Sequence, residues 1–90
     1  MYTIDTTKKF ERDFKLCMKR GLPMEDLKTV IQILKESGTL PQIYHPHKLH
    51  GNLEGVWECH IKSDWLLTWM QNDNELKLLM LRTGTHSDIF

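Results

Sequence analysis

The stretch Val56–Thr83, VWECHIKSDWLLTWMQNDNELKLLMLRT, contains three consecutive strand patterns and decides the fold. At its start, Trp57, Cys59 and Ile61 occupy every second position, which is the spacing of a strand with one buried face. Such a face packs on a core, so we expect these three side chains to be buried. His60 then projects from the opposite face of the strand.

Two further strand patterns follow, DWLLTWM (Asp64–Met70) and ELKLLMLRT (Glu75–Thr83), with the turn QNDN between them. The last pattern is apolar on both faces except at Lys77 and Arg82, which predicts a central place in the sheet. Strands joined by such short turns run antiparallel. The three patterns together predict a small, twisted antiparallel sheet.

The chain before this sheet contains patterns for one strand and two helices. YTIDT predicts a short strand at Tyr2–Thr6, and apolar residues at helical spacing predict a helix over Thr7–Arg20. A second helical stripe opens at Pro23 and ends at Ser37-Gly38, and the loop after it contains a candidate short strand at Lys48–His50. The predicted fold class is α+β, with an N-terminal two-helix hairpin packed on the sheet.

Length and composition indicate one domain covering residues 1–90, because 90 residues with 40% hydrophobic content form one modest core. The start, MYTIDTTKKF, has no cationic stretch followed by an apolar run. We therefore expect a cytoplasmic protein with neither a signal peptide nor a membrane partner. Cys17 and Cys59 lack the spacing of a metal site and are expected to be reduced core thiols.

Charge is balanced overall, with 12 basic and 12 acidic residues, but it is unevenly distributed. In the first helix pattern only Glu11 and Asp13 oppose six basic side chains. Such a helix face is either simply solvated or a surface that contacts phosphates, and the sequence leaves both readings open. The six basic residues are Lys8, Lys9, Arg12, Lys15, Lys19 and Arg20.

Polar residues from distant positions are expected to meet at one edge of the sheet. Connections in a meander alternate between two edges, so the edge that holds His60 and Asp64 also receives the end of the last strand, with Arg82 and His86. If the short strand after His47 pairs antiparallel with the first strand of the meander, this histidine reaches the same edge. Three histidines, one carboxylate and one arginine therefore converge.

This cluster has three interpretations: hydrated surface histidines, a metal site, or acid–base chemistry. A metal site would use His45, His47 and His50 of HPHKLH, because histidine is a common zinc ligand. Against it, the loop has no regular i, i+4 spacing and no HExxH or paired-cysteine motif is present.

Acid–base chemistry fits histidine because its pKa, about 6.5, lies close to neutrality. Two such groups on opposite sides of a phosphodiester suffice for RNA cleavage, one taking the 2′-OH proton and the other protonating the departing 5′ oxygen. An arginine stabilises the charge that develops on the phosphate, and an aromatic side chain such as Phe90 stacks on a base.

The segments HKLHG, ECHIKSDWLL and LRTGTHSDIF, in this order behind two helices, resemble the YafQ branch of the RelE-like bacterial toxins. The likeness extends over essentially the whole chain and includes the start YTIDTTKKFERDFK. It implies a RelE/ParE-like fold and a ribosome-dependent endoribonuclease that cuts messenger RNA during translation. It also implies a cognate antitoxin as partner, and no cofactor or metal.

The resemblance implies an acid and a base among three histidines. His86, of the motif RTGTH, would be the general acid toward the 5′ leaving oxygen. His47 would be the likeliest base for the 2′-OH, and His60 could exchange roles with it. The catalytic positions carried over are His47, His60, Asp64, Arg82, His86 and Phe90.

The other matched positions would support these histidines. Asp64 would orient or stabilise together with His60, Arg82 would contact the phosphate, and Phe90 would stack on or position a nucleotide. Trp65 is expected to be a core residue of its strand. His45 and His50 are not called for by the motif. They leave open a supplementary base or a weak metal contact, and we expect both to be exposed loop residues.

The resemblance also bears on the basic first helix, whose six cations become candidate contacts with ribosomal RNA.

Two other functions remain open on the sequence. One is a RelE/ParE-fold toxin that acts by binding, for example to DNA gyrase, without nuclease activity. The other is a metal-binding protein that uses the histidine loop.

Overall fold

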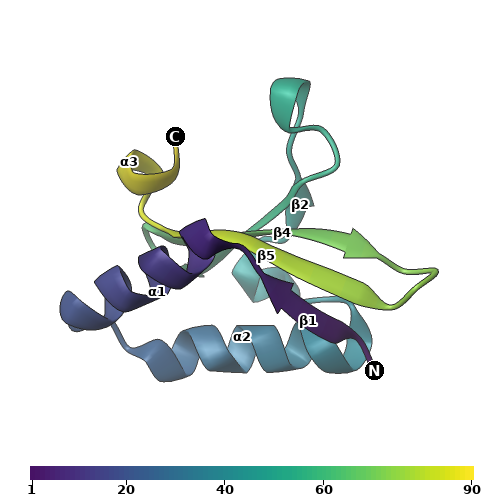
Figure 1. Ribbon diagram of the computed structural model, residues 1–90, viewed down its shortest axis with the longest axis horizontal. Helices are drawn as coiled ribbons and strands as arrows, with labels where there is room; N and C mark the ends of the chain where they lie inside the picture. Colours follow the sequence, from purple (N-terminus) through teal and green to yellow (C-terminus); the bar gives the residue numbers. More distant parts are fainter.

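Five strands form one sheet in the order β1-β5-β4-β3-β2 in the computed structural model, which describes residues 1–90 (Figure 1). Neighbouring strands run antiparallel except β1 and β5, which run parallel. The prediction of an α+β fold is confirmed, but the sheet is mixed rather than wholly antiparallel. The strands are β1 (Thr3–Thr6), β2 (His47–Lys48), β3 (Trp57–Lys62), β4 (Trp65–Asn72) and β5 (Lys77–Gly84).

The parallel pair explains why the prediction of an antiparallel sheet was wrong at this edge. Two helices and three strands separate β1 from β5, so no hairpin turn dictates their relative direction, and a long crossover allows parallel pairing. Thr3 lies opposite Lys77, and Thr6 lies opposite Met80. With β1 on one side and β4 on the other, β5 is an interior strand, as its apolar faces predict, while β4 occupies the middle of the sheet.

The two predicted helices are confirmed as α1 (Lys8–Lys19) and α2 (Met24–Ser37). The Thr7 side chain caps α1 by accepting from the Phe10 N–H at 3.0 Å. Gly38 ends α2 with a φ of 71°, a left-handed conformation that suits glycine. Figure 1 shows the helices running in opposite directions, and α2 lies along one face of the sheet.

The core lies between α2 and the sheet. Leu27, Val30 and Leu34 of α2 are at most 1% exposed, and alternate side chains of β3, β4 and β5 meet them. Trp65 is a core residue as expected, and its indole N–H donates to the Thr83 hydroxyl at 3.0 Å. The core residues contributed by the three strands are Cys59, Ile61, Trp65, Leu67, Trp69, Leu78 and Met80.

Both cysteines are free and buried, as the sequence predicts. Burial, together with the neighbouring Glu58 carboxylate, raises the pKa of the Cys59 thiol to about 12. Burial also raises the pKa of Cys17. Neither thiol is therefore poised for nucleophilic chemistry.

Two segments rise from the sheet on the side away from α2 (Figure 1). One is the part of the loop that follows the first 3₁₀ turn (Gln42–Tyr44). It contains the strand β2, which is shifted slightly toward the N-terminus from its predicted position, and a second 3₁₀ turn, Gly51–Leu53. The other is a short helix α3 (His86–Ile89), which the sequence patterns did not predict. No helix of the chain is long and apolar enough to cross a membrane.

Candidate active site

The floor of the site is the sheet face that α2 leaves uncovered. His47 of β2 lies opposite Glu58 of β3, which lies opposite Thr68 of β4, which in turn lies opposite Arg82 of β5. Paired residues of antiparallel strands share a face, so these four side chains form one row across the sheet. The predicted convergence is therefore found on a face of the sheet, between the loop and α3.

His47 is held at both ring nitrogens. Its Nε2 lies 3.1 Å from Oε1 of Glu58, and its Nδ1 lies 2.8 Å from the His45 carbonyl oxygen. The Glu58 side chain is only 6% exposed, and its second oxygen, Oε2, has no hydrogen-bond partner. A buried carboxylate with an unpaired oxygen is costly, which makes Glu58 a candidate functional residue.

Sequence reasoning missed Glu58, although a signal was present. Glu58 and His60 occupy alternate positions of one strand and so share the face opposite the core. The strand pattern alone does not show that Glu58 is buried, because the cover comes from the loop that carries His47.

His60 lies at the centre of a group of rings. Its centroid lies 6.0 Å from that of His45, 6.4 Å from that of His47 and 6.5 Å from that of His86. Its Nδ1 lies 3.4 Å from the Ser63 carbonyl oxygen, and its Nε2 makes no hydrogen bond. The structure thus brings together the three histidines singled out by sequence, and His45 joins them.

His86 is oriented by Asp64 and is in contact with Phe90. Asp64 Oδ1 accepts from the His86 backbone N–H at 3.1 Å and lies 3.3 Å from ring Nδ1. The His86 and Phe90 ring centroids are 5.8 Å apart. The Nε2 atom of His86, like that of His60, has no hydrogen-bond partner within the chain.

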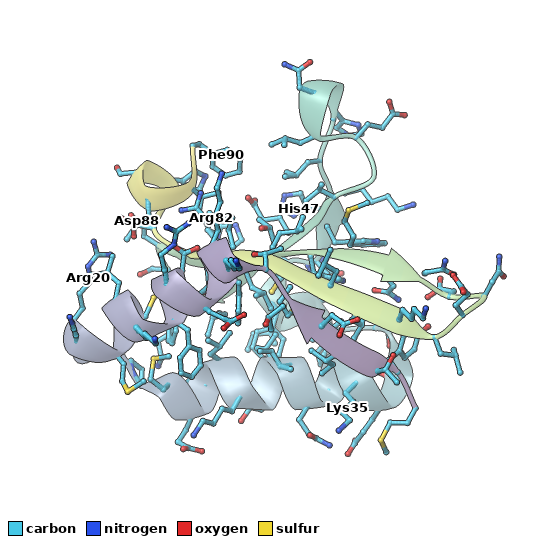
Figure 2. The ribbon with its side chains drawn as sticks, viewed as in Figure 1. Arg20, Lys35, His47, Arg82, Asp88 and Phe90 are labelled. Atoms are coloured by element: carbon cyan, nitrogen blue, oxygen red, sulfur yellow. The ribbon has the colours of Figure 1, made fainter.

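Arg82 points into the same face but is held by α1 (Figure 2). Its Nε and Nη2 donate to the two carboxylate oxygens of Asp13 at 2.7 and 3.2 Å, and Nη2 also donates to the Asp88 carbonyl oxygen at 3.1 Å. Asp13 raises the pKa of Arg82 above its ordinary value. The remaining nitrogen, Nη1, makes no hydrogen bond, so the guanidinium is oriented with one end free.

A cavity of about 300 Å³ opens beside Arg82, between the loop and α3. Its walls are mainly apolar, and Arg82 and Lys9 supply positive charge at its margin. A cavity of this size lies at the small end of the range for ligand sites. The lining residues are Thr7, Lys9, Leu49, Leu53, Val56, Thr68, Leu81, Arg82, Ile89 and Phe90.

The six basic residues of the first helix are all exposed, but they are not equivalent. Arg20 is engaged: its Nη1 and Nη2 donate to the Asp88 carboxylate at 2.6 and 3.2 Å. This pairing holds the pKa of the Asp88 carboxyl well below its usual range. The other five, Lys8, Lys9, Arg12, Lys15 and Lys19, have no side-chain hydrogen bond or ion pair.

The histidine loop does not assemble a metal site. His45 and His47 turn toward His60, whereas exposed His50 precedes the second 3₁₀ turn. No three His, Cys, Asp or Glu side chains of the chain are grouped so that they could hold a metal ion.

Comparisons with known proteins identify the family of this chain. A family model for the bacterial toxin YafQ of type II toxin–antitoxin systems matches residues 2–90. The chain is 33% identical over 88 residues to the mRNA interferase toxin YafQ of Escherichia coli strain K12, a match that covers 97% of this chain and 94% of that protein.

Solved structures extend the match to three dimensions. The fold matches a chain of the E. coli DinJ–YafQ complex with a TM-score of 0.90 and 32% identity, covering 100% of this chain and 99% of that one. It also matches a metal-bound toxin from Helicobacter pylori with a TM-score of 0.90 and 38% identity, covering 100% of both chains. The chain therefore belongs to the YafQ family of bacterial toxins of type II toxin–antitoxin systems.

Proposed function

We propose that this toxin is an endoribonuclease that cuts messenger RNA on the ribosome by attack of the RNA's own 2′-OH, with histidines as acid and base. The observation that carries the proposal is the pair His60 and His86, whose rings lie 6.5 Å apart beside an oriented arginine. The E. coli relative is named an mRNA interferase, which supports the same substrate class.

In this mechanism His60 is the general base and His86 the general acid. Each ring has its Nδ1 beside an oxygen acceptor and its Nε2 unoccupied, so a proton can be exchanged at Nε2. His60 takes the 2′-OH proton as the 2′ oxygen attacks phosphorus. His86 delivers a proton to the 5′ oxygen as the P–O5′ bond breaks, leaving a cyclic phosphate and a 5′-OH.

This proposal assigns the role of general base to His60, whereas the sequence favours His47. Both of its ring nitrogens face oxygen acceptors, and only the doubly protonated ring donates to both. With Nε2 beside Glu58 and Nδ1 beside the His45 carbonyl oxygen, His47 has no free nitrogen with which to take the 2′-OH proton. Its role is instead to stabilise negative charge that develops on the phosphate.

The remaining site residues bind and orient. Asp64 fixes the His86 ring, and Arg82 directs its free Nη1 toward the phosphate. Phe90 packs beside His86 and offers an exposed face on which a nucleotide stacks. Asp13, for which the sequence predicts no role, sets the orientation of the Arg82 guanidinium.

Two macromolecular partners follow from the same surfaces. A cognate antitoxin is supported by the DinJ–YafQ complex of the E. coli relative. Ribosomal RNA is supported by the unpaired cations of α1, which offer contacts to phosphates without competing ion pairs. Arg20 contributes less to that surface than the sequence suggested, because Asp88 already neutralises it.

The test uses purified toxin, ribosomes programmed with a defined messenger RNA, and mapping of the 5′ ends of the products. His86→Ala should abolish new cuts while the variant still folds and binds the antitoxin. His50→Ala, an exposed loop histidine outside the site, serves as the matched control and should cut like wild type. Full cleavage by His86→Ala, or no cleavage by wild-type toxin, would overturn the proposal.

A further inference from the structure

Helix α3 carries His86 and ends beside Phe90, yet little in α3 itself stabilises it. It has four residues, and none of them is buried. Helices this short are unstable without external contacts, because nucleation costs more than one turn of hydrogen bonds returns. The position of these two rings therefore depends on what holds α3 to the rest of the molecule.

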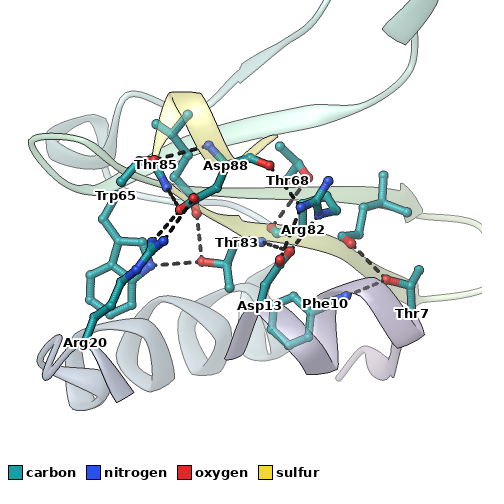
Figure 3. A network of polar contacts seen from close by, with 12 residues as sticks. Thr7, Phe10, Asp13, Arg20, Trp65, Thr68, Arg82, Thr83, Thr85 and Asp88 are labelled. Atoms are coloured by element: carbon teal, nitrogen blue, oxygen red, sulfur yellow. Dashed lines mark hydrogen bonds and ion pairs between the residues drawn. The ribbon is translucent and has the colours of Figure 1, made fainter. Parts of the chain in front are cut away.

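Asp88 is the residue through which α3 is held (Figure 3). Its carboxylate accepts from the Thr85 backbone N–H at 2.9 Å, completing a capping box at the start of the helix. The same carboxylate accepts two hydrogen bonds from Arg20, and its backbone carbonyl accepts one from Arg82. Only 21% of the Asp88 side chain is exposed.

The partners on the other side come from one face of α1. Asp13 and Arg20 are seven positions apart, about two helical turns, so both point toward the same neighbour. Asp13 holds Arg82 and accepts from the Thr83 N–H at 3.2 Å, which fixes the end of β5. Arg20 holds α3 itself, which directly follows β5 in the chain. Helix α1 thus contacts both α3, which carries the proposed acid His86, and β5, the strand that precedes α3.

We propose that Arg20 and Asp88 are positioning residues for RNA cleavage: their ion pair fixes α3 on α1 so that His86 and Phe90 stay beside His60. This inference rests on the proposed function of the histidines. It assigns Arg20 a role different from that of its basic neighbours on α1, which are free to contact RNA. Neither residue touches the reacting atoms.

The two roles for Arg20 make opposite predictions for Asp88. Arg20→Gln removes a positive charge, and Asp88→Asn removes a negative one. If Arg20 acts by attracting RNA, the first variant cuts more slowly and the second cuts faster, because the surface becomes more positive. If the ion pair positions α3, both variants cut more slowly.

The experiment compares kcat and KM for cleavage of messenger RNA on purified ribosomes. Arg20→Gln and Asp88→Asn should each lower kcat about tenfold or more, because small displacements of a catalytic group have effects of this size. Their KM should stay within about twofold of wild type. The double variant should lose no more than either single variant, since the two changes remove one interaction.

Two further variants separate positioning from loss of charge. Lys19→Gln, at an adjacent unpaired cation, should raise KM and leave kcat close to wild type, because Lys19 has no contact with α3. Lys28→Gln, on the exposed surface of α2, is the control with the same change in net charge and should match wild type in both constants. Faster cleavage by Asp88→Asn, additive losses in the double variant, or a pure KM effect of Arg20→Gln would overturn the inference.

Amide hydrogen exchange gives a readout that does not depend on activity. The N–H groups of Ile89 and Phe90 bond to the carbonyl oxygens of Thr85 and His86 inside α3. Both should exchange faster in Arg20→Gln and Asp88→Asn than in Lys28→Gln. If wild-type toxin failed to cut RNA while these amides still responded, the proposed function would fail and the contact between α1 and α3 would stand. Unchanged exchange in both variants would refute the inference directly.

Discussion

Replacing Glu58 with glutamine separates the stability of this toxin from its activity. The substitution keeps the shape of the side chain and removes the negative charge that faces His47 Nε2 at 3.1 Å. If Glu58 serves to hold His47 in the site, the variant should cleave poorly and yet fold about as well as wild type.

The magnitude follows from the two oxygens of Glu58. For full charges 3.1 Å apart, Coulomb's law with an effective dielectric constant of about 20 gives an upper bound of about 5 kcal/mol. His47 is 46% exposed, so solvent screening reduces the net attraction to about 1 kcal/mol. Oε2 is buried without a partner, which costs about 1–3 kcal/mol. The amide of glutamine still places a polar atom in this buried position, but a neutral amide costs less to bury than a carboxylate. The lost attraction and the partly relieved burial cost nearly cancel, so the free energy of unfolding of Glu58→Gln should lie within about 1 kcal/mol of that of wild type.

Cleavage, by contrast, should fall strongly. Losing one preorganised charged group at a developing oxyanion lowers kcat by about 100-fold. Urea unfolding followed by circular dichroism measures the first quantity, and product mapping on programmed ribosomes measures the second. Glu54→Gln, an exposed glutamate in the adjoining loop, is the matched control and should behave as wild type in both assays. A free energy of unfolding more than about 2 kcal/mol below that of wild type, or cleavage at the wild-type rate, would refute the reasoning.

Three further outcomes are expected. The thiol of Cys59 should resist iodoacetamide in the folded toxin at pH 8 and react only after unfolding, because burial raises its pKa to about 12. Mass spectrometry of the labelled protein measures this reaction, and rapid labelling of the folded toxin would contradict the prediction. The pKa of Asp88 lies below its ordinary value of 3.8, so its contribution to holding α3 is complete above that value and is lost as pH falls further. Two-dimensional NMR from pH 6 to pH 2 should therefore show Ile89 and Phe90 shifting late in acid, and a transition above pH 5 would be inconsistent with this pairing. The triple variant Lys8→Gln, Arg12→Gln, Lys15→Gln should bind ribosomes more weakly and with a smaller salt dependence while its fold is unchanged. Sedimentation at several salt concentrations measures this binding. Unaltered binding would show that the basic face of α1 is solvated and does not contact RNA.

Local patterns in the sequence were sufficient for most of the elements. Helices α1 and α2 were predicted because Thr7 and Gly38 mark a start and an end around clear apolar stripes. The strands β3 to β5 were predicted from their alternating or fully apolar runs. The site residues His47, His60 and His86 were brought together correctly because short hairpins dictate which strand ends meet.

Most features that the sequence did not predict depend on partners distant in the chain. Nothing local shows that β1 joins β5 in parallel, since that pairing is set by how the helices cross the sheet. The same holds for Asp13 with Arg82 and for Arg20 with Asp88, where one partner alone looks like a solvated charge. Helix α3 did leave a local signal, because Thr85 and Asp88 have the spacing of a capping box.

The position of β1 in the sheet has a consequence for the order of folding. The Thr7 hydroxyl donates to the Leu81 carbonyl oxygen, a contact between residues 74 positions apart. Contacts of such high sequence separation form late, because the entropy of closing a long loop is lost before any contact compensates for it. The hairpins β3–β4–β5 and the helix pair can form earlier from local contacts. Since α1 directly follows β1, the contacts of α1 with β5 and α3 are complete only when the chain between Thr7 and Leu81 has closed. We therefore expect a partly folded chain to be harmless, with cleavage returning only in the slowest phase of a refolding experiment; activity in an earlier phase would contradict this order.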